Sequence, residues 1–178
     1  ANDIYKEIIP RELSWTMQVG IYQQTDWYVN KAGKLDMNAL IIAFQDFFRK
    51  HSDSWIQQMQ YNEAGPQLLL MAFLQRIING GGQIEREYGL GKQRVDLYVL
   101  WNYPNGVQEV VIELKIKYNS LEKTIEDGLQ QTAQYMDKCG TTEGHLLIFD
   151  RTENKLWDDK IFQKDYEYEQ KKIKVWGM

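Results

Sequence analysis

The stretch Val111-Ile112-Glu113-Leu114-Lys115 decides the fold, because it has the composition of a buried strand and still carries two charged side chains. Side chains two residues apart on a strand point to the same face of the sheet. We therefore expect Glu113 and Lys115 to lie side by side, with Ile112 and Leu114 on the opposite face. Because burying an uncompensated charge is costly, the pair needs either a partner or a chemical role.

A second apolar run, from Arg94 to Trp101, lies upstream and carries one acid, Asp96. The Asn105-Gly106 step between the two runs favours a hairpin turn, and pairing of the two strands would bring Asp96 close to Glu113. Two carboxylates and a lysine on adjacent strands suggest a divalent-metal site that acts on phosphates. The Glu-x-Lys pattern alone is equally typical of a solvated strand face, so the interpretation depends on Asp96 and on the downstream sequence.

Downstream, the spacing of apolar residues predicts a helix over residues 121–139 with Gly140 as its C-terminal cap. Its apolar stripe consists of Leu121, Ile125, Leu129, Ala133 and Met136. Gln131 and Tyr135 are four residues apart and share a neighbouring face. The run from Gly144 to Asp150 then predicts a central strand, and the order strand, strand, helix, strand indicates a parallel crossover.

The N-terminal third predicts helices. Asp36 is a suitable N-terminal cap for the first helix, and Ser54 for a short second helix. Residues 67–78 are apolar on nearly all sides, which predicts a third helix that is buried. A first strand is expected near residues 83–88, and Ile173-Lys174-Val175-Trp176 predicts a closing strand with Trp176 docked on the body. We therefore expect a mixed α/β (α+β) fold, with a helical extension over residues 1–60 packed on a compact unit over residues 61–178.

The ordered set of Asp96, Glu113-x-Lys115 and Gln131-x-x-x-Tyr135 resembles the PD-(D/E)xK nuclease superfamily in its RecB-like form, over residues 60–150. More narrowly, the chain is similar to nuclease-like domains at the C-terminal end of bacterial AAA-type ATPases. Segments 4–13, 91–97 and 145–151 carry that likeness. The resemblance implies a restriction-endonuclease-like core sheet flanked by helices, and a nucleic-acid substrate, with an ATPase domain in the same full-length chain.

For the site itself, the resemblance implies that Asp96 and Glu113 bind Mg²⁺ or Mn²⁺ and that Lys115 positions the attacking water and stabilises charge on the phosphate. We expect Asp96 to be a surface carboxylate in a cleft, so that Asp96→Ala leaves the fold intact. Val95 stands before Asp96 where the motif has proline, as in many relatives.

Other residues complete the implied site. Gln131, Tyr135 and Arg94 would contact the substrate from the helix and from the first of the two strands. The superfamily often adds an acid on the first core helix, and Glu63 is our choice for it, with Glu85 and Glu87 as alternatives.

Composition limits the other possibilities. The chain has 178 residues, one cysteine and two histidines, so neither a zinc-ligand set nor a histidine-based nucleophilic site is expected. Gly80-Gly81-Gly82 is not followed by Gly-Lys-Ser/Thr and does not predict a phosphate-binding loop. The lone cysteine and the absence of a signal or membrane-spanning run predict a cytoplasmic protein without membrane partners. The start at Ala1 suggests a piece of a longer protein.

The net charge of −4 counts against a nonspecific DNA coat, although a basic patch of Arg86, Lys92, Arg94, Lys115 and Lys117 remains. Three functions stay open. The first is a Mg²⁺- or Mn²⁺-dependent DNA nuclease. The second is a nuclease fold that binds nucleic acid or protein without cleavage, and the third is an unrelated α/β interaction domain.

Overall fold

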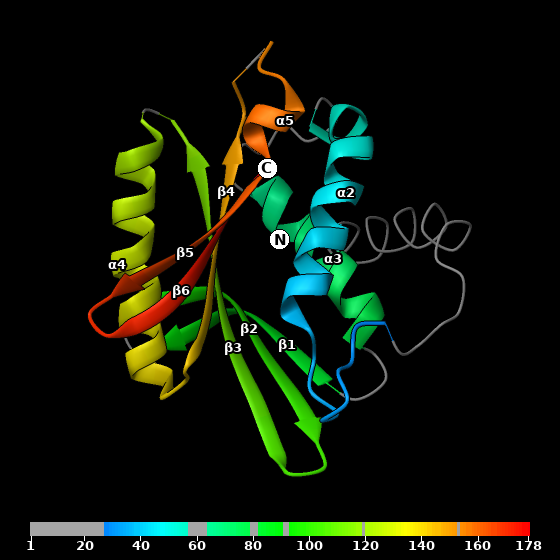
Figure 1. Cartoon of the computed structure of the whole chain (residues 1–178), viewed down its shortest axis with the longest axis vertical. Coiled ribbons are helices and arrows are strands. Elements are labelled where there is room, and N and C mark those ends of the chain that lie inside the picture. The colour runs from blue at the N-terminus through cyan, green and yellow to red at the C-terminus, as the bar shows by residue number, and fades with distance from the viewer. Residues whose placement is uncertain (1–26, 57–63, 79–81, 91–92, 119, 153) are drawn as a thin grey trace.

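The computed structural model describes residues 27–56, 64–78, 82–90, 93–118, 120–152 and 154–178. Their elements, shown in Figure 1, are α2 (Met37–Ile56), α3 (Ala64–Ile78), β1 (Gly82–Leu90), β2 (Gln93–Tyr103), β3 (Gly106–Lys117), α4 (Leu121–Cys139), β4 (Glu143–Asp150), α5 (Trp157–Lys160), β5 (Phe162–Tyr168) and β6 (Lys171–Gly177). No helix in the described part of the chain is long and apolar enough to cross a bilayer.

Six strands of the described residues form one mixed sheet in the order β1-β2-β3-β4-β6-β5. The outer pairs β1–β2, β2–β3 and β5–β6 are antiparallel, whereas β3–β4 and β4–β6 are parallel. Helix α4 connects β3 to β4 and lies on one face of the sheet, while α2 and α3 cover the other face (Figure 1). The mixed α/β fold predicted from the sequence is therefore confirmed.

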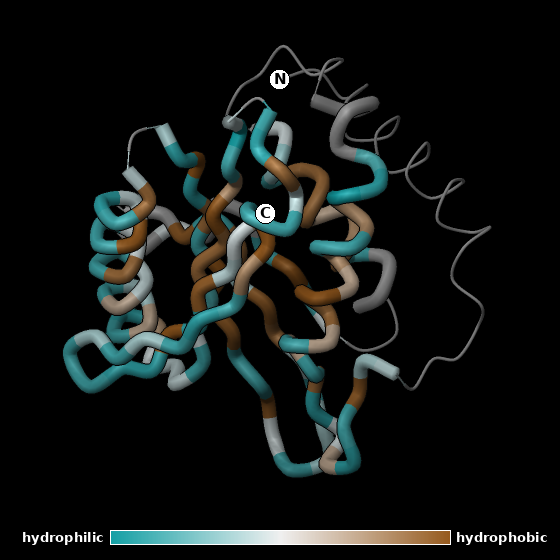
Figure 2. The backbone as a smooth tube through the Cα atoms, turned by 45° about the horizontal axis from the view of Figure 1, so that its top comes forward, coloured by the Kyte–Doolittle hydropathy of each residue, from teal (hydrophilic) through white to brown (hydrophobic). Residues whose placement is uncertain are grey.

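Each face of the sheet has its own apolar core, visible as the brown interior in Figure 2. Toward α2 and α3, the sheet contributes Leu97, Val99, Ile112, Leu147, Phe149 and Trp176. Toward α4, it contributes Val111, Leu146, Ile148, Ile173 and Val175. Helix α2 belongs to the first core through Leu40, Ile41, Phe44 and Phe48. The domain boundary expected at residues 60 and 61 lies outside the described residues, so it stays a prediction.

Local capping explains why the expected helices begin and end where they do. The Ser120 hydroxyl accepts the Lys123 N–H at 3.1 Å to start α4, and Gly140 ends it at φ 69° in the left-handed region. The Asp36 side chain accepts the Ala39 N–H at 3.0 Å at the start of α2. The closing strand is also confirmed as β6, with the Trp176 side chain fully buried.

One expectation needs correction, and one strand was missed. Ser54 does not begin a short helix, because α2 continues through it to Ile56. Helix propagation is cooperative, and neither glycine nor proline interrupts residues 37–56, so a serine in the last turn is tolerated. The edge strand β5 was not predicted as a strand, because it is stabilised by pairing with β6 rather than by an apolar run of its own.

Helix α4 lies very close to the strand β4 because two glycines face the contact. A Cβ atom at Gly128 would come within 2.5 Å of Leu146, and one at Gly144 within 2.4 Å of Met136. Leu146 is completely buried and has no space into which to move. The absence of these side chains therefore sets the distance between α4 and the sheet.

We expect Gly128→Val to lower the free energy of unfolding by about 3 kcal/mol, because the added side chain overpacks the core beside Leu146. Gly89→Val is the matched control, since a Cβ there meets nothing within 4 Å. Urea denaturation followed by circular dichroism measures both variants. Equal stability of the two variants would show that α4 can move away from β4 at little cost.

Candidate functional site

The site lies where two paired strands separate. Leu97 opposite Ile112 is the last backbone pair between described residues of β2 and β3, whereas β3 stays paired with β4 as far as Lys117 opposite Asp150. Asp96 and Glu113 are the next residues beyond that last pair. The tertiary structure therefore places these two acids on either side of a fork in the sheet.

The Asp96 side chain bridges this fork. Its Oδ2 accepts the backbone N–H of Leu114 at 2.9 Å, replacing the strand partner that β3 has lost. On a regular strand, side chains two residues apart point to the same face of the sheet. Val95 and Leu97 break this rule, because Val95 packs in the core toward α4 and Leu97 in the core toward α2 and α3. The regular alternation of side chains along β2 is therefore interrupted at Asp96. Asp96 is thus half-buried, and its carboxylate accepts a backbone N–H, a structural contact that the expectation of a surface carboxylate in a cleft did not include.

Gln67 of α3 is a further member of the site that the sequence did not reveal. Its Nε2 donates to the backbone oxygen of Asp96 at 3.2 Å and lies 3.5 Å from the carboxylate Oδ1. Gln67 therefore contacts both the backbone and one carboxylate oxygen of Asp96, while Leu114 donates to the other carboxylate oxygen. A signal was present, because a glutamine in a helix expected to be buried must find a hydrogen-bond partner.

Glu113 is buried with 3% of its surface exposed, and its carboxylate is only half satisfied. The Lys115 ammonium donates to Oε1 at 2.8 Å, while Oε2 has no hydrogen-bond partner among the described residues. Burial is the largest cause that raises the pKa of Glu113 to about 7, and the charge of Asp96 raises it further. The Lys115 ammonium and the backbone N–H of Asp96 lower this pKa but do not compensate for the burial.

Tyr135 of α4 lies close enough to Glu113 and Asp96 to be affected by their charges. It is 5% exposed, and burial together with the charges of Glu113 and Asp96 raises the pKa of its hydroxyl to about 12. Gln131 lies one turn earlier on α4 and is half-buried. Within the described residues, no hydrogen bond joins Gln131 to Asp96 or Glu113. The structure thus brings Tyr135 near the two carboxylates, whereas the placement of Gln131 in the site stays a prediction.

Three side chains that were expected at or near the site have no described position. Glu63 and the side chains of Arg94 and Glu87 lie outside the described residues. Glu85 is described; it lies on β1 opposite Tyr98 and accepts a hydrogen bond from Gln83 at 2.9 Å. Among described residues, no group of three His, Cys, Asp or Glu side chains is arranged to hold a metal ion. The described acids of the site are therefore Asp96 and Glu113.

These two acids fit a hard divalent cation in one respect. Glu113 Oε2 is a buried carboxylate oxygen without a donor, next to a second carboxylate whose charge raises its pKa. Mg²⁺ prefers such oxygens and usually keeps several water molecules, so two protein ligands are sufficient when a substrate phosphate completes the shell. Asp96 and Glu113 are the residues that could hold the ion.

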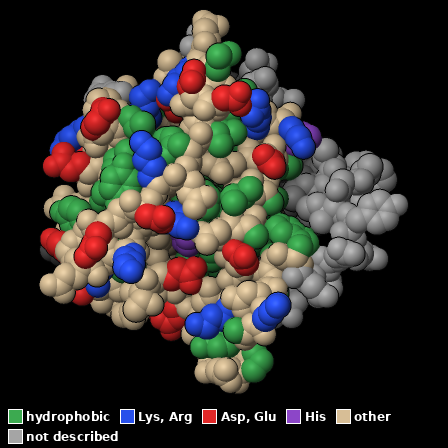
Figure 3. All heavy atoms as spheres, in the orientation of Figure 1, with side chains coloured by type: hydrophobic (Ala, Val, Ile, Leu, Met, Phe, Trp, Pro, Cys, Tyr) green, Lys and Arg blue, Asp and Glu red, His purple; other side chains and the backbone are tan. Residues whose placement is uncertain are grey.

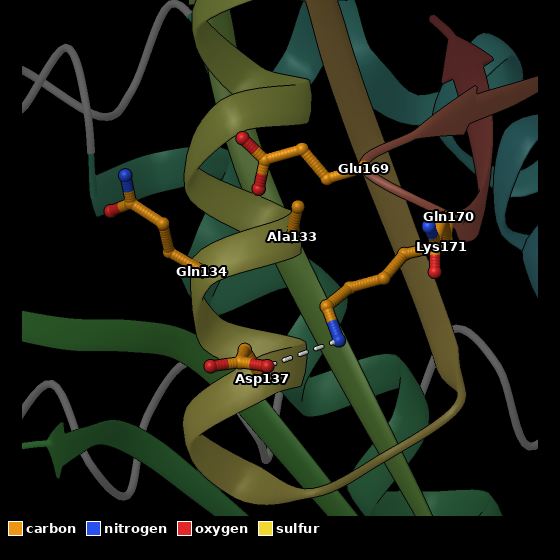
Figure 4. A pocket seen from close by; sticks show the side chains of 6 residues that line it. All are labelled: Ala133, Gln134, Asp137, Glu169, Gln170 and Lys171. Carbon is orange, nitrogen blue, oxygen red and sulfur yellow. Dashed lines mark ion pairs between the residues drawn. The ribbon is translucent and has the colours of Figure 1, made fainter.

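A separate open hollow lies on another side of α4, and Figure 4 shows the residues that line it. It is bordered by α4 and by the turn between β5 and β6, and it shares no residue with the site at the fork. Its ion pair, Lys171 to Asp137 at 3.5 Å, involves an aspartate that is 79% exposed. An exposed pair of this kind contributes little, so we assign no chemistry to this hollow.

No family model matches the chain, and neither a curated protein nor a solved structure matches it.

Proposed function

We propose that the protein is a metal-dependent nuclease that hydrolyses phosphodiester bonds of DNA. One observation carries the proposal: the buried Glu113 carboxylate has an unpartnered Oε2 beside Asp96 and an ammonium, that of Lys115, 2.8 Å from its other oxygen. A buried acid with a strongly raised pKa is costly for the fold, and such groups concentrate at functional sites. Acid, acid and lysine together supply what phosphodiester hydrolysis requires.

In this proposal Asp96 and Glu113 hold Mg²⁺ or Mn²⁺. When held by these two residues, such an ion would supply charge neutralisation at the phosphate and activation of a water for attack. Leu114 N–H and Gln67 keep the Asp96 carboxylate in one orientation. The Lys115 side chain is 26% exposed, so its ammonium can face both Glu113 and a phosphate in solvent, where it stabilises the developing charge.

Tyr135 has a separate role. Its hydroxyl is protonated at neutral pH, as any tyrosine hydroxyl of ordinary or raised pKa is, so this group can donate a hydrogen bond. We assign Tyr135 and Gln131, together with Arg94 and Glu63, to substrate or metal contacts on the basis of the resemblance to the PD-(D/E)xK superfamily. The same resemblance supports an ATPase domain in the full-length chain, and the lone cysteine supports a cytoplasmic protein.

The second candidate function is a nuclease fold that binds nucleic acid or a protein without cleaving it. It is favoured by one observation, the hydrogen bond from the Lys115 ammonium to Glu113 Oε1 at 2.8 Å, which holds the site together without any metal. This function predicts DNA binding that is independent of divalent ions.

The test is nicking of supercoiled plasmid by the wild-type protein with Mg²⁺ or Mn²⁺. We expect cleavage that EDTA abolishes and that rises about tenfold per pH unit below pH 7, because Glu113 must lose its proton before it can bind the ion. Protein-free plasmid at each pH is the control. DNA binding without cleavage at any pH would replace the first function by the second.

A further inference from the structure

A second charged cluster lies at the carboxyl ends of β3 and β4. Asp150 is 8% exposed, and its Oδ2 accepts Lys117 Nζ at 2.9 Å and Lys155 Nζ at 2.8 Å. Its Oδ1 accepts both the backbone N–H of Thr152 at 3.0 Å and the Thr152 hydroxyl at 2.6 Å. One carboxylate thus fixes two lysines in a defined geometry.

This cluster carries an excess of positive charge. The pKa of Asp150 is held well below its usual range by the Lys155, Thr152 and Lys117 hydrogen bonds, which outweigh the effect of burial, so the carboxylate stays ionised. Two ammoniums around one carboxylate leave a net charge of about +1. Lys117 and Lys155 remain 18% and 28% exposed, so this charge reaches solvent.

The cluster is a neighbour of the site at the fork. Lys115 and Lys117 lie on the same face of β3, about 7 Å apart along the strand. In the parallel ladder they lie opposite Ile148 and Asp150. Both strands run toward the end of the molecule where α5 lies (Figure 1), and Figure 3 shows basic and acidic side chains mixed over that end.

Exposed acidic side chains also lie near this end of the molecule. The first turns of α4 carry Glu122, Glu126 and Asp127, all exposed. Lys123 forms ion pairs with Glu126 at 3.1 Å and with Asp127 at 3.0 Å, which partly neutralises them. Unlike these exposed acids, the acid of the cluster is buried and outnumbered by its lysines.

We propose that Lys117 and Lys155, held by Asp150, bind a phosphate of the nucleic-acid strand adjacent to the phosphate at Glu113 and Lys115. The identity of the strand as DNA rests on the proposed function, whereas the anion-binding geometry does not. Phosphate contacts position a nucleic acid without reading its sequence, so this subsite orients the strand over the carboxylates. The competing explanation is a purely structural clasp at the end of β4.

The test is the affinity for a short fluorescein-labelled DNA duplex, measured by anisotropy over a salt series in EDTA. Lys155→Gln should weaken binding roughly tenfold at low salt and reduce the salt slope by about 1, the loss of one phosphate contact. Asp150 keeps Lys117 in this variant, which protects the fold. Lys155→Arg should restore binding, because it restores the cation. Lys164→Gln on β5 makes the same charge change away from the cluster and should bind as wild type.

Wild-type affinity and salt slope in Lys155→Gln would overturn the proposal, and so would an equal loss in Lys164→Gln. A fall in melting temperature without rescue of binding by Lys155→Arg would leave only the structural clasp. The nicking assay separates this proposal from the nuclease function. If the wild-type protein cleaves DNA and Lys155→Gln binds DNA normally, only the phosphate subsite is contradicted. If Lys155→Gln loses salt-dependent DNA binding and the wild-type protein cleaves nothing, the subsite is supported and the nuclease function is contradicted.

Discussion

Asp96→Asn should reduce metal-dependent cleavage at least about a hundredfold, a loss of roughly 3 kcal/mol of transition-state stabilisation. Asparagine removes the negative charge that holds the ion and keeps a side-chain oxygen as acceptor for the Leu114 N–H. The fold should therefore survive the change, and single-turnover plasmid nicking together with a thermal melt measures both effects.

The choice of asparagine rather than alanine follows from the fork geometry. Asp96→Ala leaves the Leu114 N–H without its acceptor and Gln67 without the carboxylate, which costs about 1–3 kcal/mol of stability. Loss of activity in that variant would mix chemistry with unfolding. Asp165→Asn is the matched control, because this aspartate is 80% exposed on β5. Cleavage by Asp96→Asn at the wild-type rate would mean that the activity belongs to another site or a contaminant.

Glu113→Gln should make the protein more stable above neutral pH while abolishing metal-dependent activity. In the unfolded chain the pKa of Glu113 has its ordinary value of 4.5, whereas burial in the folded protein raises this pKa to about 7. Between these values the folded state binds more protons than the unfolded state, so wild-type stability falls as pH rises from about 4.5 to 7. The total fall is up to about 3 kcal/mol, and glutamine removes it because it does not ionise.

Chemical denaturation at pH 5 and pH 8 measures this difference. We expect Glu113→Gln to exceed the wild type at pH 8 and to lose this advantage at pH 5, where wild-type Glu113 is protonated. Glu122→Gln, an exposed acid in the first turn of α4, should keep the wild-type pH dependence. Parallel pH profiles for wild type and Glu113→Gln would show that Glu113 is ionised in the folded protein. A substitution that stabilises the fold and removes activity is typical of functional sites.

Local features of the chain were readable from the sequence. Helix α4 was predicted with both of its ends, because its apolar stripe and Gly140 act within a few residues of each other. The placement of Glu113 and Lys115 on one face follows from the two-residue period of a strand, and their 2.8 Å contact agrees with it. The Asn105-Gly106 turn predicted the β2–β3 hairpin that brings Asp96 toward Glu113.

Contacts between distant segments were decided only by the tertiary structure. Gln67 reaches Asp96 across 29 positions of sequence, and Lys117 reaches Asp150 across 33. No local period or cap encodes such contacts, because they depend on how α3 and β4 pack against the rest of the sheet. The fork between β2 and β3 has the same origin, since β3 remains paired with β4 after β2 has diverged. The sequence by itself thus determined which charged residues share a strand face, and packing determined which of them are buried, paired or left without a partner.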